Sequence, residues 1–264
     1  MTTLLRLFLA LCLGHLITDF VLQTHALVAQ KRAGKLAAYA QHGLIHYLCA
    51  VILLAFFVPG SFFSLRTHAI LIALTLVHLL IDFAKIRFVA QEWISGGTRS
   101  FVADQLLHLV TIVLAAKLLT PAVNFGGLIA WLGSFRALPN KFLVVPVIYL
   151  AVVFGGGYLV RFLTRTLAEG IKSHSPDKPS EQLSNAGLYI GWLERFLVIT
   201  AMLLQSPATV GLILTAKSIA RYPEFKSERF AEYFLIGTLL SISLAILGGA
   251  ILSKVIFGRV HFAG

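Results

Sequence analysis

Long runs of apolar residues constrain this chain more than any other feature of its sequence. A helix that crosses a bilayer needs about 20 mostly apolar residues, because its backbone polar groups must be satisfied within the segment. The matching runs are Thr3 to Gln23, Gln41 to Val58, His68 to Ile86, Phe101 to Leu119, Phe142 to Leu163, Gly187 to Leu204, Thr209 to Ala220 and Ala231 to Phe257. The seventh run is short, so the sequence predicts an all-α, polytopic transmembrane helix bundle with about 7 to 8 spans.

The composition supports a membrane location and argues against a nucleic-acid partner. The chain is 58% hydrophobic and 12% charged, with a mean hydropathy of +0.87, which is too apolar for one soluble core. Its formal net charge is +11, but Lys and Arg lie in short loops between apolar runs rather than along one face. Cys12 and Cys49 lie inside separate apolar runs, so we expect neither a disulfide nor a thiolate metal site.

The distribution of Lys and Arg over alternate loops predicts the orientation of the helices. One set of loops holds Lys31, Arg32, Lys35, Lys85, Arg87, Arg99, Arg161, Arg165, Lys172, Lys178, Arg221, Lys226 and Arg229. The opposite set holds Arg6, Arg66, Arg136, Lys141, Lys254 and Arg259. By the positive-inside rule the richer set faces the cytoplasm. Both termini then lie outside if the run from Thr209 to Ala220 crosses, and otherwise the C-terminus lies inside.

An internal repeat divides the N-terminal part of the chain into two helix hairpins. The text His15-Leu16-Ile17-Thr18-Asp19-Phe20 reappears as His78-Leu79-Leu80-Ile81-Asp82-Phe83, and His42-x-x-x-His46 matches Asp104-x-x-x-His108. Each unit has two crossings, so the copies at residues 1–60 and 66–123 keep one orientation about an axis along the membrane normal. We expect a four-helix bundle at residues 1–123 and further membrane helices at residues 124–264, with a polar cytoplasmic loop at residues 164–186.

Each helix of this predicted bundle carries two ionisable groups four residues apart, on one helix face. The candidate metal ligands are His15, Asp19, His42, His46, His78, Asp82, Asp104 and His108. The predicted topology places the three Asp residues and His42 near the cytoplasm, and the other four His residues one turn deeper. Gln23 and Gln41 are weaker candidates. We assign no role to His25, His68, His174 and His261, which lie at predicted helix ends or in loops.

A divalent metal ion would compensate these buried groups, each of which costs about 2.5 to 3.5 kcal/mol on insertion scales. Imidazole and carboxylate ligands suit zinc first, with manganese, iron or nickel as alternatives. Asp19, Asp82 and Asp104 are also the candidate catalytic residues, because one carboxylate left free of the metal would serve as a general base. One ion with outer polar partners, two ions bridged by an Asp, and a hydrogen-bonded proton pathway all remain open.

The C-terminal half carries a second polar set. Glu194-Arg195 lies inside the sixth run, Lys217 and Arg221 share a face of the seventh, and Glu232 begins the eighth. Arg195, Lys217 and Arg221 are candidates for binding a phosphate or lipid headgroup, with Glu194 and Glu232 as supporting residues. The alternative is ordinary anchoring, in which Lys and Arg extend to the membrane surface and Arg195 pairs with Glu232.

These motifs resemble the bacterial membrane proteins grouped as domain-of-unknown-function family 3307. The resemblance rests on His15-x-x-x-Asp19-Phe20-x-x-Gln23, His42-Gly43-x-x-His46, His78-x-x-x-Asp82 and Asp104-Gln105-x-x-His108, and on Gly191-Trp192-Leu193-Glu194-Arg195 and two later motifs. It implies a multi-pass protein of the bacterial inner (cytoplasmic) membrane and no particular function. A looser similarity connects the intramembrane His/Asp pairs to membrane-bound metal-dependent hydrolases.

Three functions are compatible with these features. The first is a metal-dependent hydrolase acting on a lipid-linked ester or phosphoester, with the lipid bilayer and a phospholipid or lipid-linked substrate as partners. The second is a transporter or channel for divalent cations or protons through the same polar layer. The third is a structural or sensory membrane protein stabilised by metal. The outer halves of the first four spans are almost wholly apolar, which favours a one-sided site over a pore. The sequence does not indicate the oligomeric state.

Overall fold

The computed structural model describes residues 3–58, 64–120, 141–165, 181–226 and 228–258, and these residues contain no β-strand. Six of the described helices are long and apolar enough to cross a membrane: Thr3–Val21, Leu36–Phe57, Leu65–Ala90, Thr98–Leu118, Leu143–Leu163 and Phe230–Phe257. The all-α transmembrane fold predicted from the sequence is therefore confirmed, and the chain is a multi-pass membrane protein. The chain divides into two compact units, Met1–Val147 and Ile148–Gly264.

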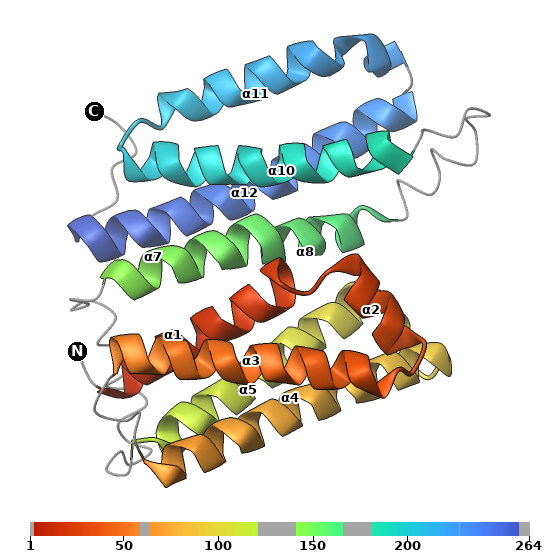
Figure 1. Cartoon of the computed structure of the whole chain (residues 1–264). Helices are drawn as coiled ribbons and strands as arrows, with labels where there is room; N and C mark the ends of the chain where they lie inside the picture. The colour runs from red at the N-terminus through yellow and green to blue at the C-terminus, as the bar shows by residue number, and fades with distance from the viewer. Residues whose placement is uncertain (1–2, 59–63, 121–140, 166–180, 227, 259–264) are drawn as a thin grey trace. The chain divides into compact units, whose positions relative to one another are not determined.

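Four long helices form the bundle of the first unit. They are α1 (Thr3–Leu16, continued by a π-helical turn at Ile17–Val21), α3 (Leu36–Phe57), α4 (Leu65–Ala90) and α5 (Thr98–Leu118). Their contacts close a ring in which α1 touches α3 and α5, and α4 touches the same two helices. The related helices α1 and α4 thus occupy opposite corners of the ring (Figure 1). The hairpin duplication predicted from the sequence would place the two copies in such positions.

A short helix that the apolar runs did not predict lies between α1 and α3. This helix, α2 (His25–Arg32), begins where the side chain of Thr24 accepts a hydrogen bond from the backbone of Leu27, at 3.3 Å. It contacts α3 and α4, and it buries Leu27 and Lys31 (Figure 1). The second hairpin has no matching helix, because α4 runs to Ala90 and α5 begins at Thr98.

The second unit is built on α10 (Glu181–Leu203) and α12 (Glu228–Phe257), which pack along each other. α7 (Lys141–Leu150) runs across the boundary between the two units. The π-helical turn Ala151–Gly155 and α8 (Gly156–Leu163), which follow it, contact both α10 and α12. α11 (Ala208–Arg221) packs on α10 and leads through a 3₁₀ turn at Tyr222–Lys226 into α12.

Two of the predicted spans are not among the six long apolar helices. α11 has 14 residues and at about 1.5 Å per residue reaches about 21 Å, which is short of a hydrocarbon core of about 30 Å. α10 has 23 residues, but Glu194 and Arg195 and a polar first turn reduce its apolar character. It begins at Glu181, inside the loop predicted at residues 164–186, and residues 166–180 of that loop lie outside the described residues.

Candidate metal centre

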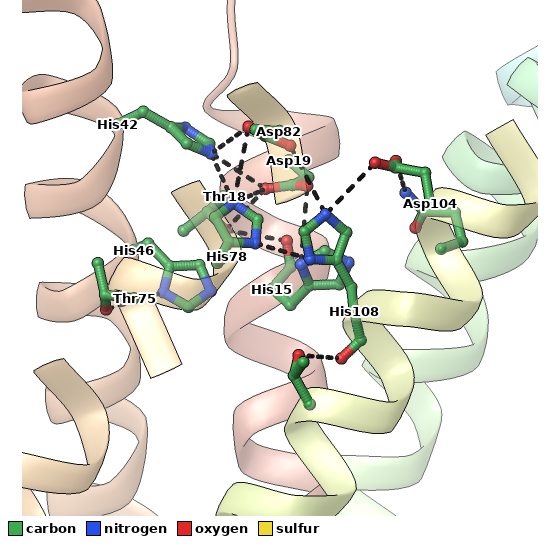
Figure 2. Close-up of polar contacts among 12 residues, drawn as sticks. His15, Thr18, Asp19, His42, His46, Thr75, His78, Asp82, Asp104 and His108 are labelled. Carbon is green, nitrogen blue, oxygen red and sulfur yellow. Dashed lines mark hydrogen bonds and ion pairs between the residues drawn. The ribbon is translucent and has the colours of Figure 1, made fainter. Parts of the chain in front are cut away.

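All eight predicted ligands lie in the interior of the N-terminal bundle (Figure 2). α1 and its π-turn supply two of them, and α3, α4 and α5 supply two each: His15, Asp19, His42, His46, His78, Asp82, Asp104 and His108. Because the residues of each pair are four apart, each helix turns both toward the bundle axis. The sequence prediction that these faces meet thus agrees with the structure.

The four deeper His residues pack against one another. Ring centroids are 4.3 Å apart for His46 and His78, 4.3 Å for His78 and His108, and 4.8 Å for His15 and His108. His46 also has a hydrogen-bonding contact of 3.3 Å between its Nδ1 and the Thr75 hydroxyl. A glycine assists the close approach of α3 and α4 here, since a Cβ on Gly43 would lie 2.8 Å from a methyl carbon of Leu79.

The carboxylates lie beside this imidazole layer. The Oδ1 atom of Asp19 is 3.4 Å from the Nε2 atoms of both His42 and His78. Asp82 approaches His108 at 3.6 Å, and Asp104 approaches the same ring at 3.6 Å. The π-turn at Ile17–Val21 carries Asp19 and widens the helix locally, with Leu22 donating its backbone N–H to the carbonyl of Ile17 at 2.9 Å. Such turns are frequent at functional sites.

Two lysines that the sequence analysis did not include pair with two of the three carboxylates. Lys31 from α2 donates to Asp82 at 2.5 Å, and Lys85 from α4 donates to Asp104 at 2.8 Å. The charge distribution predicts a cytoplasmic loop position for Lys31. Because Lys31 and Asp82 are 51 residues apart, no local sequence pattern predicts their contact. Among the described residues, the polar partners of Asp19 are His15, His42, His78 and its neighbour Thr18, so no described lysine pairs with this carboxylate.

His15 is the residue whose buried polar atoms are least satisfied. The side chain is 4% exposed, and neither ring nitrogen has a hydrogen-bond partner; its nearest carboxylate oxygen, on Asp19, is 3.7 Å away. The same is true of one nitrogen each on His42 and His108. Buried polar atoms are normally paired, and each unpaired one costs about 1 to 3 kcal/mol. An ion or water at this place would supply the missing partner.

Five of the eight predicted ligands have atoms close enough together to share an ion. One group is His15, His78 and His108, and the other is Asp19, His78, Asp82 and His108; within each group the ligand atoms lie within 4.8 Å of one another. His42, His46 and Asp104 belong to neither group and fit the role of outer hydrogen-bonding partners. The donor set, imidazole with carboxylate, fits a divalent transition metal.

Beyond the deeper His residues, the described part of the bundle interior is filled mainly by apolar side chains, with Thr67 and the Nε atom of Arg6 as buried polar groups. Leu5, Leu54, Leu71 and Ile112 come from the four helices, all on the side of the imidazole layer away from α2, and each is at most 2% exposed. The cluster is therefore closed by packed hydrocarbon at one end. At the other end lie the carboxylates, Lys85 and α2.

The second polar set lies in the C-terminal unit and is paired within it. Arg195 donates to the carbonyl of Val153, in the π-turn, and to the Ser241 hydroxyl, both at 3.0 Å. Lys217 donates to Glu194 at 2.6 Å. Arg221 ends α11, and Glu232 is exposed on α12 rather than paired with Arg195. The structure thus brings Glu194 and Lys217 together and directs Arg195 into the helix packing.

Fold and site together define a multi-pass α-helical membrane protein with a buried His/Asp cluster in its N-terminal bundle. Residues 7–129 match the family model described as "Protein of unknown function (DUF3307)". This match covers the N-terminal bundle and supports the resemblance to the family that the sequence motifs indicated. No curated protein and no solved structure matches the chain.

Proposed function

We propose that the N-terminal bundle binds a divalent metal ion, zinc first among the candidates, and that the protein is a metal-dependent hydrolase of a lipid-linked ester or phosphoester. One observation carries the metal site: both ring nitrogens of buried His15 lack a hydrogen bond, and its Nδ1 is 3.7 Å from Asp19, the carboxylate that no lysine neutralises. A histidine that only stabilised the bundle would be expected to have hydrogen bonds. Ligation by a metal explains why this one is maintained in an apolar interior.

The residues fit the parts of a hydrolytic site. His78 and His108 are common to both ligand groups and would hold the ion, with His15 completing one group and Asp82 the other. The ion would supply Lewis-acid activation of water. Asp19 is suited to accept the proton from that water, because no ammonium group holds its charge. Its close neighbours His42 and His78 orient the carboxylate.

Access from one end supports an enzyme over a pore. Packed side chains such as Leu5, Leu54 and Ile112 close the bundle beyond the imidazoles, whereas a transport path needs a polar route on both sides. The proposal places the open end toward the cytoplasm of a bacterial inner membrane, which agrees with the excess of Lys and Arg on that side. It does not draw on Arg195, Lys217 or Arg221, since all three have partners in the protein.

The test of the hydrolase is turnover of lipid-linked esters by purified protein. Wild-type protein loaded with zinc is expected to release product from a set of phospholipid and lipid-linked phosphoester substrates in detergent micelles. Asp19→Asn is expected to lower the rate at least about a hundredfold, as loss of a general base does. The matched control is Asp104→Asn, which removes a carboxylate outside both ligand groups. Equal turnover by wild type and Asp19→Asn would contradict the proposal.

A transporter of protons or divalent cations is the second candidate, and a chain of imidazoles favours it. The Nε2 atoms of His42 and His78 are 2.9 Å apart, and the Nδ1 atoms of His78 and His108 are 3.1 Å apart. In each contact one ring donates N–H and the other accepts, so a proton can pass along the three rings. Flux of metal ions or protons into proteoliposomes, driven by a metal or pH gradient, would support this candidate. Lipid turnover without any such flux would support the hydrolase.

A further inference from the structure

Lys31 is the most deeply buried charged side chain of the N-terminal bundle. It is 1% exposed, and its ammonium group donates to Asp82 at 2.5 Å. α2 holds it there: the hydroxyl of Tyr39 donates to the backbone carbonyl of Lys31 at 3.3 Å, and the Tyr39 ring lies 5.7 Å from the ammonium nitrogen. Leu27 anchors the same helix in the bundle.

The charge balance of the cluster shows what this lysine does. Asp19, Asp82 and Asp104 bring three negative charges, and Lys31 and Lys85 bring two positive ones. A divalent ion added to this set would leave an excess of one positive charge in an apolar interior, which is costly. With Lys31 removed from Asp82, the same ion would balance the remaining charge. Lys31 and a metal at Asp82 therefore compete electrostatically.

We propose that Lys31 is a tethered cation that occupies Asp82 in the metal-free protein, and that the incoming divalent ion displaces it together with α2. This inference rests on the proposed metal site and adds its regulation: α2 opens when metal binds and closes over the carboxylates when metal leaves. α2 is suited to such a movement because it has eight residues. It connects α1 and α3 in the sequence and is not one of the four long helices that form the ring.

Replacement of Lys31 tests the competition directly. In Lys31→Met a side chain of similar length keeps the packing but leaves Asp82 without a counter-charge in the metal-free state. Binding of zinc then no longer has to break an ion pair, so its Kd is expected to fall at least about tenfold. The full chain in detergent would be titrated with zinc against a chromophoric chelator. Without metal, the same variant is expected to have a lower melting temperature than wild type. Zinc is expected to raise its melting temperature by more than it raises that of wild type.

Lys85→Met is the matched control. Lys85 also forms an ion pair with a carboxylate, but its partner Asp104 supplies no atom to either ligand group. Its zinc affinity is expected to stay within about threefold of wild type, because the Lys85 side chain is 33% exposed and solvent screens its charge, unlike that of Lys31. An unchanged or weaker zinc affinity in Lys31→Met would overturn the displacement. It would show that Lys31 has no effect on zinc binding or favours it.

A second measurement uses the unmodified protein and so does not depend on a variant that folds. An amine-acylating reagent would be applied with and without saturating zinc, and labelled lysines would be identified by mass spectrometry. Lys31 is expected to react slowly without zinc and at least about tenfold faster with it. Lys85, whose side chain is 33% exposed, is expected to react in both states. Continued protection of Lys31 in the zinc-loaded protein would overturn the proposal.

The outcomes separate this inference from the proposed function. If wild-type protein binds neither zinc nor manganese, iron or nickel, the metal site itself is wrong, and the inference falls with it. If wild type binds metal while Lys31 stays protected and Lys31→Met binds no more tightly, the metal site stands and the displacement is refuted.

Discussion

At the scale of single residues, the polar groups of the cluster differ in whether protein hydrogen bonds and ion pairs satisfy them. Lys31 and Lys85 neutralise Asp82 and Asp104, and Thr75 contacts His46. His15, in α1, has no hydrogen bond at either ring nitrogen, and Asp19, in the π-turn that continues α1, has no lysine partner among the described residues. Buried polar atoms that have no hydrogen bond or counter-charge in the protein are those expected to bind a ligand.

His15→Leu is expected to stabilise the metal-free protein while abolishing metal binding. Leu removes two buried, unpartnered nitrogens, so the free energy of unfolding should rise by about 1 kcal/mol. The measurement is thermal unfolding of chelator-treated protein together with its metal content. His46→Leu is the control: it leaves the Thr75 hydroxyl without its contact at 3.3 Å, so it should lose stability and keep metal. A His15→Leu protein that still contains metal would contradict the assignment.

Asp82→Asn and Asp104→Asn are expected to differ in metal content. Both changes are isosteric and remove one charge from a lysine-paired carboxylate, but only Asp82 belongs to a group whose ligand atoms lie within 4.8 Å of one another. Asp82→Asn should weaken metal binding by about 10- to 100-fold, and Asp104→Asn by less than about threefold. Titration of the two proteins with zinc measures the difference. The reverse order would assign the ion to Asp104 and Lys85 instead.

At the scale of helices, the positions of the ligands could be predicted from the sequence because the relevant pattern is local. Spacing of four residues within an apolar run determines both the helix and the shared face. The π-turn at Ile17–Val21 and helix α2 were missed. The π-turn adds a residue without changing composition. α2 has a local signal in its N-cap residue Thr24, but the contact of its Lys31 with Asp82 joins residues 51 apart and has none.

The contact between α10 and α12 gives a prediction about the second unit. A Cβ on Gly249 would lie 2.5 Å from the Cβ of Met202, too close without a shift of the helices. Gly249→Ala is expected to lower the free energy of unfolding by about 1 to 3 kcal/mol. Gly211→Ala, with nothing within 4 Å of the added Cβ, is the control and should be neutral or slightly stabilising. Equal stability of the two variants would argue against this helix packing.

At the scale of the whole molecule, membrane insertion and the duplicated bundle could be predicted, whereas the number of crossings could not. Hydropathy identified every long helix, yet α11 has 14 residues and α10 buries Glu194 and Arg195. Whether such helices cross depends on their packing partners, which composition does not contain. The division expected after residue 123 falls in residues 121–140, which lie outside the described residues, and the contacts divide the chain at Val147.

The predicted orientation can be tested with single cysteines in a chain whose Cys12 and Cys49 have been replaced. Gln91, after α4, and Ser64, before it, are exposed at opposite ends of this helix. Because the Lys/Arg-rich loops are expected to face the cytoplasm, Gln91→Cys should react with a membrane-impermeant maleimide only in broken cells. Ser64→Cys should react in intact cells. The opposite pattern would invert the topology and place the cluster near the outer face.

The metal content of the purified full-length protein tests the central claim most directly. Elemental analysis of protein extracted in mild detergent, with no chelator present, is expected to find about one divalent transition-metal ion per chain, and far less in Asp82→Asn. Wild-type protein that contains no such metal, and takes up none from solutions of zinc, manganese, iron or nickel, would contradict the account.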